Sequence, residues 1–172
     1  MRKLHIINLE KMGGVERLFL QYIQDVTTNQ DCIFCISNQI GPEIAQHLTG
    51  RKVTFVNRIL NNYPIKFPPF LRKYALQTKT WLANPEAIIV WDLVPVFVAK
   101  PTRGKVIYYD HGCSWRYPHN KKTMNFFAAL DGTISASYAS KRVMELRFNL
   151  SCPSQVLINR ILPPANIFTG DK

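Results

Sequence analysis

The sequence predicts an α/β domain in which helices cover both faces of a parallel sheet of about seven strands. Short apolar runs alternate along the chain with segments of helical periodicity. The apolar runs have few polar positions, as strands buried on both faces require. A chain of 172 residues, 47% of them hydrophobic, is long enough for one domain with its own core.

Seven segments are predicted as strands, because each carries consecutive apolar or β-branched residues between turn signals. In chain order they are Leu4–Leu9, Asp31–Ser37, Lys52–Val56, Glu86–Trp91, Lys105–Tyr109, Gly132–Ala136 and Gln155–Ile158. Strands that are separated by helices must be joined by crossovers, which favours parallel pairing.

The segments between these strands carry helical signals. After the first strand, apolar residues recur at helical spacing and define one face: Val15, Leu18, Phe19, Tyr22, Ile23 and Val26. Gly41-Pro42-Glu43 opens a short helix that runs to Leu48, with proline in a tolerated first turn. The remaining predictions are helices over Phe70–Leu82, Lys122–Leu130 and from Ser137 or Ser140 to Phe148, and a helical turn over Val94–Ala99.

The charge is strongly positive, with 22 Lys and Arg against 11 Asp and Glu. No acidic residue occurs between Ile44 and Pro85, where seven basic residues occur. Such a field attracts phosphate, anionic lipid or nucleic acid. No segment resembles a secretory signal or is long and apolar enough to span a bilayer. We therefore expect a cytoplasmic protein, with peripheral contact to the inner face of the membrane as a further option.

The four cysteines do not predict a metal site. Cys32 and Cys35 have the spacing of half a zinc or redox site, but no second pair stands at ligand spacing. An offset of three within a strand places their side chains on opposite faces. We interpret them as ordinary thiols of the core.

Two adjacent glycines, Gly13 and Gly14, lie in the loop between the first strand and the first helix. In open α/β sheets, ligands bind beyond the carboxyl ends of the strands. Glycine permits positive φ and close approach of a ligand, and the helix amino end offers N–H groups to an anion. The dinucleotide and phosphate-loop glycine motifs are both absent, so a plain turn is the alternative.

Four short motifs follow one another over essentially the whole chain. They are Gly13-Gly14-Val15-Glu16-Arg17 before a helix, Tyr109-Asp110-His111-Gly112 at a strand end, Asp131–Ser137 before a helix bearing Lys141 and Arg142, and Val156–Ile161. This ordered set resembles the amino-terminal, acceptor-side domain of retaining nucleotide-sugar glycosyltransferases of the GT-B fold (group 1, family 4-like). Arg160 departs from the family pattern, which usually has glycine after asparagine.

The resemblance implies a Rossmann-like, doubly wound domain over residues 1–162, which is one half of a two-domain GT-B enzyme. Residues 163–172 would be the interdomain linker or the start of a missing carboxy-terminal domain. The implied reaction moves a sugar from a nucleoside diphosphate to a saccharide or lipid-linked acceptor with retention, in polysaccharide or lipopolysaccharide synthesis. No metal or other cofactor is expected, and this fragment alone is expected to be inactive.

The resemblance makes His111 the candidate catalytic residue, with a capping or core role as the alternative. The candidates for binding donor or acceptor lie in the strand-end loops: Gly13, Gly14, Asp92, Asp110, Gly112 and Ser137. Asp110 could instead orient His111 or cap a turn. Ser137 could cap its helix, and Asp92 could have only a local turn role.

Lys66, Arg72 and Lys73 are the candidate contacts to an anionic membrane or acceptor, because aromatic residues accompany them in the acid-free stretch. Packing of those aromatic residues in the core is the alternative. The same mixture also suits single-stranded nucleic acid. A second class of function therefore stays open, a non-catalytic basic module that binds nucleic acid or an anionic polymer, although nucleic acid is the less favoured partner.

Overall fold

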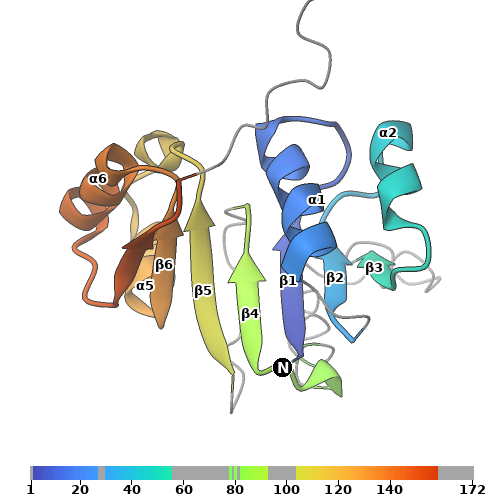
Figure 1. The fold of residues 1–172 in the computed structure, drawn as a ribbon. Coiled ribbons are helices and arrows are strands. Elements are labelled where there is room, and N and C mark those ends of the chain that lie inside the picture. The colour runs from blue at the N-terminus through green and yellow to red at the C-terminus, as the bar shows by residue number, and fades with distance from the viewer. Residues whose placement is uncertain are drawn as a thin grey trace, which may run out of the picture.

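The computed structural model describes residues 2–26, 30–55, 82–92 and 104–158, together with Thr78 and Thr80. Within these residues, seven strands form one sheet in the order β3-β2-β1-β4-β5-β6-β7 (Figure 1). Every neighbouring pair of strands is parallel. The predicted Rossmann-like α/β fold with a seven-stranded parallel sheet is confirmed.

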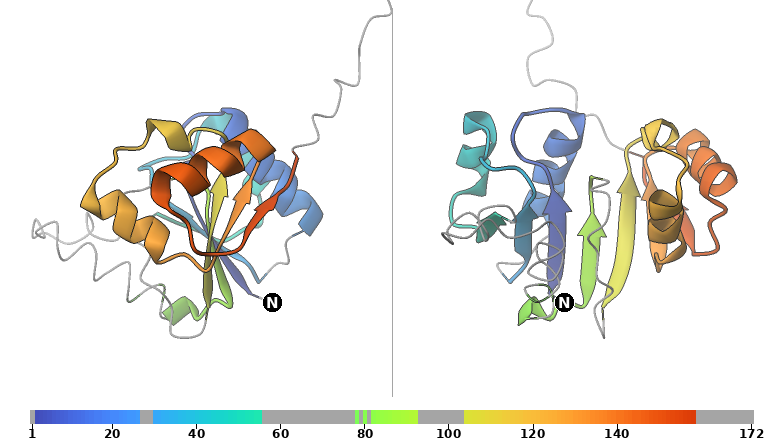
Figure 2. Two further views of the ribbon diagram at one scale, coloured as in Figure 1. Left: turned by 90° about the vertical axis from the view of Figure 1, so that its left-hand side faces the viewer. Right: turned by 180° about the vertical axis from the view of Figure 1, so that it is seen from behind.

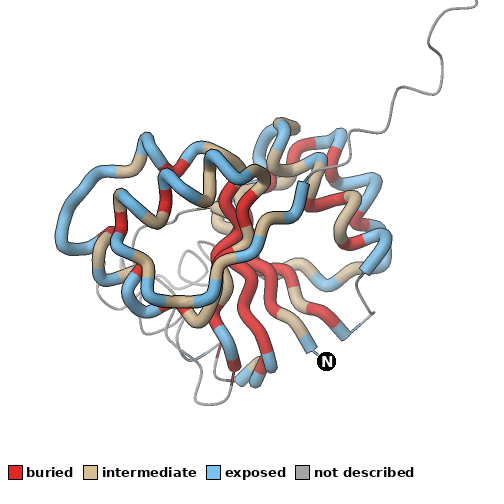
Figure 3. Tube along the Cα trace, turned by 60° about the vertical axis from the view of Figure 1, so that its left-hand side comes forward, coloured by how far each residue is buried: buried red, intermediate tan, exposed pale blue. Residues whose placement is uncertain are grey.

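The strands agree with the predicted segments to within one or two residues at each end. Their bounds are β1 Lys3–Ile7, β2 Cys32–Cys35, β3 Val53–Phe55, β4 Ala87–Val90, β5 Lys105–Asp110, β6 Gly132–Ser135 and β7 Ser154–Val156. β4 is buried along its whole length, as a central strand of a sheet covered on both faces should be (Figure 3).

The described α-helices are α1 Gly14–Val26, α2 Pro42–Ala45, α5 Lys121–Ala128 and α6 Tyr138–Phe148, and two short 3-10 helices are η1 Gln46–Leu48 and η2 Ser114–Arg116. Asn120 caps α5, because its side chain accepts a hydrogen bond from the Thr123 backbone N–H. The predicted helix over Phe70–Leu82 lies largely outside the described residues, and the turn over Val94–Ala99 lies wholly outside them.

The helices cover the sheet from two sides (Figure 2). Each side has its own core. Leu4, Ile6 and Val106 lie in the core that α5 and α6 cover. Ile7 and Ile89, at alternate positions, lie in the core that α1 and α2 cover. Cys32 packs against the first core and Cys35 lies in the second, which confirms that they point to opposite faces.

One detail of α1 was predicted wrongly. Phe19 and Ile23 are buried as expected, and Leu20 is buried as well, although it was not assigned to the apolar face. Val26 was assigned to that face and is 52% exposed, because it is the last residue of the helix and lines an open groove instead of the core. None of the described helices combines the length and the apolar character that spanning a membrane would need.

Candidate functional site

The strand order of the sheet reverses between β1 and β4. β2 and β3 extend the sheet on one side of β1, while β4 to β7 extend it on the other. The chain therefore leaves β1 and β4 toward opposite sides, which opens space beyond their carboxyl ends. The loop that follows β1, Asp92 after β4 and His111 after β5 all come just after the carboxyl ends of their strands. This edge of the sheet lies at the arrowheads of the strands in Figure 1.

Asp92 joins the ends of β1 and β4. Its Oδ2 accepts a 2.7 Å hydrogen bond from the Asn8 backbone N–H. Burial raises the pKa of Asp92 to about 6, the Asn8 bond opposes that shift, and the negative charge of Glu16 adds to it. Asp92 therefore has the structural role of holding the first loop, and its carboxyl group titrates near neutral pH, where it could exchange a proton.

The loop from Asn8 to Gly13 is held on a second side by the loop between β2 and α2. The Gly41 backbone N–H donates to the Leu9 carbonyl at 2.8 Å. A Cβ at Gly41 would lie 2.8 Å from the Glu10 carbonyl oxygen, so this close approach of two loops requires glycine. From the sequence, Gly41 was expected only to open a helix, and its place in the segment after the second strand was the one available signal.

Gly13 and Gly14 are not required by backbone conformation. Among the described glycines, positive φ occurs at Gly50 and Gly112 and not at this pair, so of the two properties that glycine permits, only open space for close approach is left here. A Cβ at Gly13 would lie 2.7 Å from Glu16 Oε2, whereas a Cβ at Gly14 would have no atom within 4 Å. Gly14 is exposed and begins α1. This pair therefore leaves open backbone, and open N–H groups of the first helical turn, at the edge of the sheet.

Glu16 occupies part of this space, since its carboxylate lies over Gly13. A carboxylate in the first turn of a helix interacts favourably with the helix dipole. An anionic ligand that approaches this turn must displace the Glu16 side chain, whereas a hydroxyl group could donate a hydrogen bond to it.

His111 directly follows β5 and is half-buried as a residue. The ring stacks on Tyr109, with centroids 4.8 Å apart and planes 12° apart, and on Trp91, with centroids 5.6 Å apart. Burial lowers the pKa of His111 to about 4, although a hydrogen bond to the Trp91 backbone opposes this shift. The imidazole is therefore neutral at physiological pH.

One ring nitrogen of His111 is left without a partner. His111 Nε2 is buried and has no hydrogen-bond partner within the described part of the chain. A buried polar atom without a partner is costly in a folded protein, and such atoms are found at functional sites.

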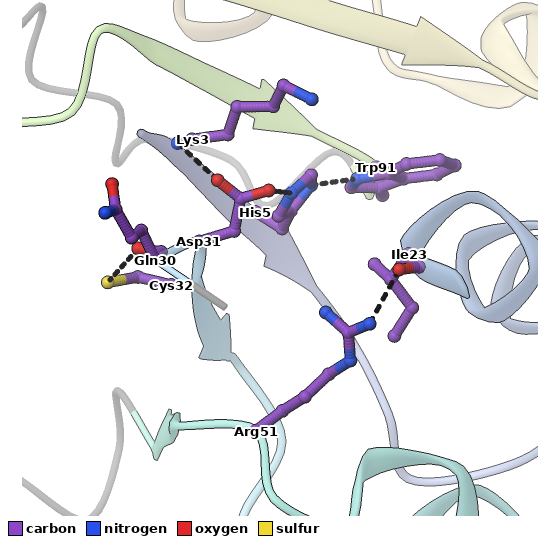
Figure 4. Close-up of polar contacts among 8 residues, drawn as sticks. All are labelled: Lys3, His5, Ile23, Gln30, Asp31, Cys32, Arg51 and Trp91. Carbon is purple, nitrogen blue, oxygen red and sulfur yellow. Dashed lines mark hydrogen bonds and ion pairs between the residues drawn. The ribbon is translucent and has the colours of Figure 1, made fainter. Parts of the chain in front are cut away.

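A buried aromatic cluster supports His111 from within the core. Trp91 is 1% exposed, and its indole Nε1–H donates to His5 Nδ1 at 3.2 Å (Figure 4). Burial lowers the pKa of His5 to about 4, so this imidazole is also neutral. Its Nε2 and Asp31 Oδ2 are 3.9 Å apart, too far for a hydrogen bond. No role was predicted for His5 from the sequence, and no local signal links it to Trp91.

Asp110 and Gly112 have structural roles that explain their presence. Asp110 is fully buried, and its carboxylate accepts from the Gly112 backbone N–H at 3.2 Å and from Ser114 Oγ at 3.5 Å. It therefore caps the turn after β5, and alternation along the strand places it on the opposite face from His111. Gly112 has φ of +85°, which disfavours any residue with a side chain.

Ser137 directly precedes α6 and accepts a 3.1 Å hydrogen bond from the Ser140 backbone N–H, which confirms its capping role. Lys66, Arg72 and Lys73 lie outside the described residues. The structure therefore brings Gly13, Gly14, Asp92 and His111 to one edge of the sheet, and binding of a ligand by any of them stays a prediction. Among the described residues, no three His, Cys, Asp or Glu side chains form a cluster that could hold a metal ion.

Two open depressions lie near this edge. One, of about 210 Å³, runs between α1 and the end of β7 and is lined by Tyr22, Tyr109 and Leu157 among others. The other, of about 360 Å³, lies between the loop after β1 and the start of α2, beside Glu10 and Pro42. Neither is lined by His111.

No protein-family model matches the chain, and no curated protein matches it in sequence. Solved structures do share its fold. Anabaena Alr3699/HepE in complex with UDP-glucose has a TM-score of 0.64 and 13% sequence identity, over 92% of this chain and 44% of that one. The same Anabaena protein with UDP and glucose has a TM-score of 0.63 at equal identity and coverage. The chain thus spans less than half the length of the protein that it resembles, and the likeness shows the fold alone.

Proposed function

We propose that this chain is the acceptor-side, amino-terminal domain of a GT-B glycosyltransferase that uses a nucleoside diphosphate sugar. The observation that carries the proposal is the fold likeness over 92% of the chain to a protein solved with UDP-glucose and with UDP and glucose. The edge of the sheet where parallel α/β folds bind ligands also carries an open glycine backbone and the His111 imidazole, whose Nε2 has no hydrogen-bond partner among the described residues.

In the proposed reaction, the bond between the anomeric carbon and the diphosphate oxygen breaks, and the acceptor hydroxyl oxygen bonds to that carbon. The hydroxyl proton passes to the leaving diphosphate, and configuration is retained. The proposal uses no metal and no other cofactor. In this proposal the enzyme has a second domain, which would supply most of the donor site. That domain would follow residues 163–172, the predicted linker, which lies outside the described residues.

His111 Nε2 would form a hydrogen bond with a hydroxyl of the transferred sugar. This atom is buried in the present structure, so contact requires a small local shift of the groups that cover it. Asp92 and Glu16 suit hydroxyl donors of a saccharide acceptor, since both are hydrogen-bond acceptors when ionised.

The experiment compares the 172-residue chain with the longest natural open reading frame that contains it. UDP-glucose is the donor, and glucosides and membrane extracts are the acceptors. Transfer is measured as the release of UDP. We expect transfer by a two-domain protein and none by the 172-residue chain. Robust transfer by the short chain alone would contradict the half-enzyme proposal. A parent protein that consumes no nucleotide sugar and binds single-stranded nucleic acid would contradict the proposed activity.

A further inference from the structure

A second surface of the chain is basic and aromatic, and it begins just beyond His111. Trp115 in η2 is 57% exposed. Arg116, His119, Lys121 and Lys122 are also exposed. We call these five residues the β5–α5 surface. They were not assigned a function from the sequence, and they lie within the described part of the chain.

The charge of the β5–α5 surface is not balanced by nearby acids. The sequence has no Asp or Glu between His111 and Leu130. Asp110 is buried in its turn, and Asp131 bonds to the Val106 backbone N–H. Glu145 on α6 is 3.7 Å from both Lys141 and Arg142, so its charge is already offset there.

Buried contacts hold the exposed residues in place. Ser114 is buried beside Asp110, with a hydrogen bond to its carboxylate. The Tyr117 hydroxyl is 2.9 Å from the Tyr108 hydroxyl, and Arg147 donates to the Tyr117 carbonyl at 2.8 Å. The Trp115 and Arg116 side chains therefore project outward from a segment that is fixed on both sides of them.

Lys121 and Lys122 stand where a helix normally avoids positive charge. They are the first two residues of α5, and this first turn contains no acidic residue. Lysines at a helix amino end oppose the helix dipole, so their position favours binding over local stability. The unpaired N–H groups of the turn add to the positive field.

Trp115 adds an apolar anchor to this field. The Arg116 guanidinium lies over the indole, 4.8 Å from the ring centroid. A base or a sugar ring could therefore stack only on the other face of the indole. Tryptophan beside arginine and lysine is the combination found at the headgroup level of bilayers, where the ring is half apolar and the cations meet lipid phosphates.

We infer that the β5–α5 surface docks on an anionic phospholipid bilayer. Trp115 enters the headgroup region, while Arg116, Lys121 and Lys122 meet phosphates. This inference does not need the proposed glycosyltransferase activity. If that activity holds as well, docking places the carboxyl edge of the sheet beside the membrane, because η2 begins three residues after His111, and the acceptor is then a lipid-linked saccharide.

The test is sedimentation of the chain with phosphatidylcholine vesicles at about 0.1 M salt. Neutral vesicles contain phosphatidylcholine alone, and anionic vesicles also contain about one third phosphatidylglycerol. The wild-type chain should sediment with the anionic vesicles and stay in solution with the neutral ones. Lys121→Gln with Lys122→Gln should lower the partition constant by roughly tenfold to thirtyfold, since each cation near an anionic surface contributes about a factor of five.

The matched control is Lys52→Gln with Lys105→Gln, which removes the same charge. Both of these lysines are exposed, and they lie at the amino ends of β3 and β5, the opposite edge of the sheet. This pair should change the partition constant by less than about threefold. Circular dichroism checks that each variant folds. Equal losses from the two pairs would mean attraction by net charge alone and would overturn the inference.

A second readout follows Trp115 itself. Vesicles with brominated lipid chains should quench the tryptophan fluorescence of the wild type, and Trp115→Phe should lose that quenching. Quenching that persists in Trp115→Phe would overturn the inference. A second outcome would also overturn the inference: no binding to vesicles, but tight binding of a single-stranded oligonucleotide that is weakened in the Lys121→Gln, Lys122→Gln variant. The surface would then bind nucleic acid.

Discussion

Replacement of Gly14 by alanine separates a ligand-binding role from a structural one. Gly14 begins α1 without positive φ, and an added Cβ would meet no atom within 4 Å. Alanine at such a position restricts the unfolded chain and strains nothing in the folded one. We therefore expect Gly14→Ala to increase the free energy of unfolding by about 0.4–1 kcal/mol. For a chain of this size, that corresponds to a melting temperature about 1–4 °C higher.

The ligand-binding role predicts the opposite effect on function. If a substrate approaches the backbone at Gly14, a methyl group occupies the space that it needs. A misfit of one carbon in a binding site typically lowers kcat/KM by about 10- to 200-fold. Gly14→Val should lower it further. The assays are thermal unfolding of the 172-residue chain and transfer from UDP-glucose by the full-length protein.

Gly41→Ala is the matched control, because its Cβ would lie 2.8 Å from the Glu10 carbonyl oxygen. Backbone must move to make that space, so this variant should be less stable than the wild type by about 1–3 kcal/mol. A Gly14→Ala protein that is less stable than the wild type would refute the local geometry. A Gly14→Ala enzyme that is more stable and fully active would refute the steric role of the glycine.

If the proposed transferase activity holds, His111→Ala should lower turnover of the full-length protein by roughly two to three decades, the effect of one transition-state hydrogen bond, and unchanged turnover would remove its catalytic role. The pKa of Asp92 in the folded chain, about 6, exceeds its ordinary value of 3.8, so ionisation destabilises the fold as pH rises through this window. Asp92→Asn should therefore be more stable than the wild type by roughly 1–3 kcal/mol at pH 8 but not at pH 3.5. Urea unfolding at the two pH values measures this difference, and an equal difference between variant and wild type at both pH values would contradict the prediction. His5 has the opposite sign, because its pKa of about 4 lies below 6.5, so stability is present above pH 6.5 and is lost as pH falls to 4. His5→Gln should lessen that acid loss in the same titrations, and an unchanged slope would show that His5 is not its source. Arg72→Ala with Lys73→Ala should weaken binding to anionic vesicles, and equal sedimentation of this variant and the wild type would remove those two residues from the membrane contact.

The sequence by itself determined the fold and the order of its elements. Strand segments such as Ala87–Val90 are apolar at every position, which only a sheet covered on both faces accommodates. Helix starts were also readable, because Ser137 carries its capping signal in its own side chain. These features depend on residues that are neighbours along the chain, so periodicity and capping rules reach them.

The candidate site was only partly predictable. The rule that ligands bind beyond parallel strands placed Gly14, Asp92 and His111 at one edge, and the structure does bring them there. The reason for the glycines was not predictable, since backbone angles and open space at Gly14 depend on what packs nearby. Gly41 is required for a contact that the sequence did not indicate, because its partner, Glu10, lies in a different loop.

Only the tertiary structure decided how the polar groups pair. Parallel pairing of β1 with β4 places His5 beside Trp91, the residue that follows β4, although 86 positions separate them in the chain. Their hydrogen bond supports the ring stack under His111. The tertiary structure also uses the Asp110 carboxylate to accept a hydrogen bond from the Gly112 backbone N–H in the turn after β5. Partner choice of this kind follows from strand order and register, which local sequence patterns do not encode. The protonation states of His111 and Asp92 likewise follow from burial, and burial exists only once distant segments have packed together.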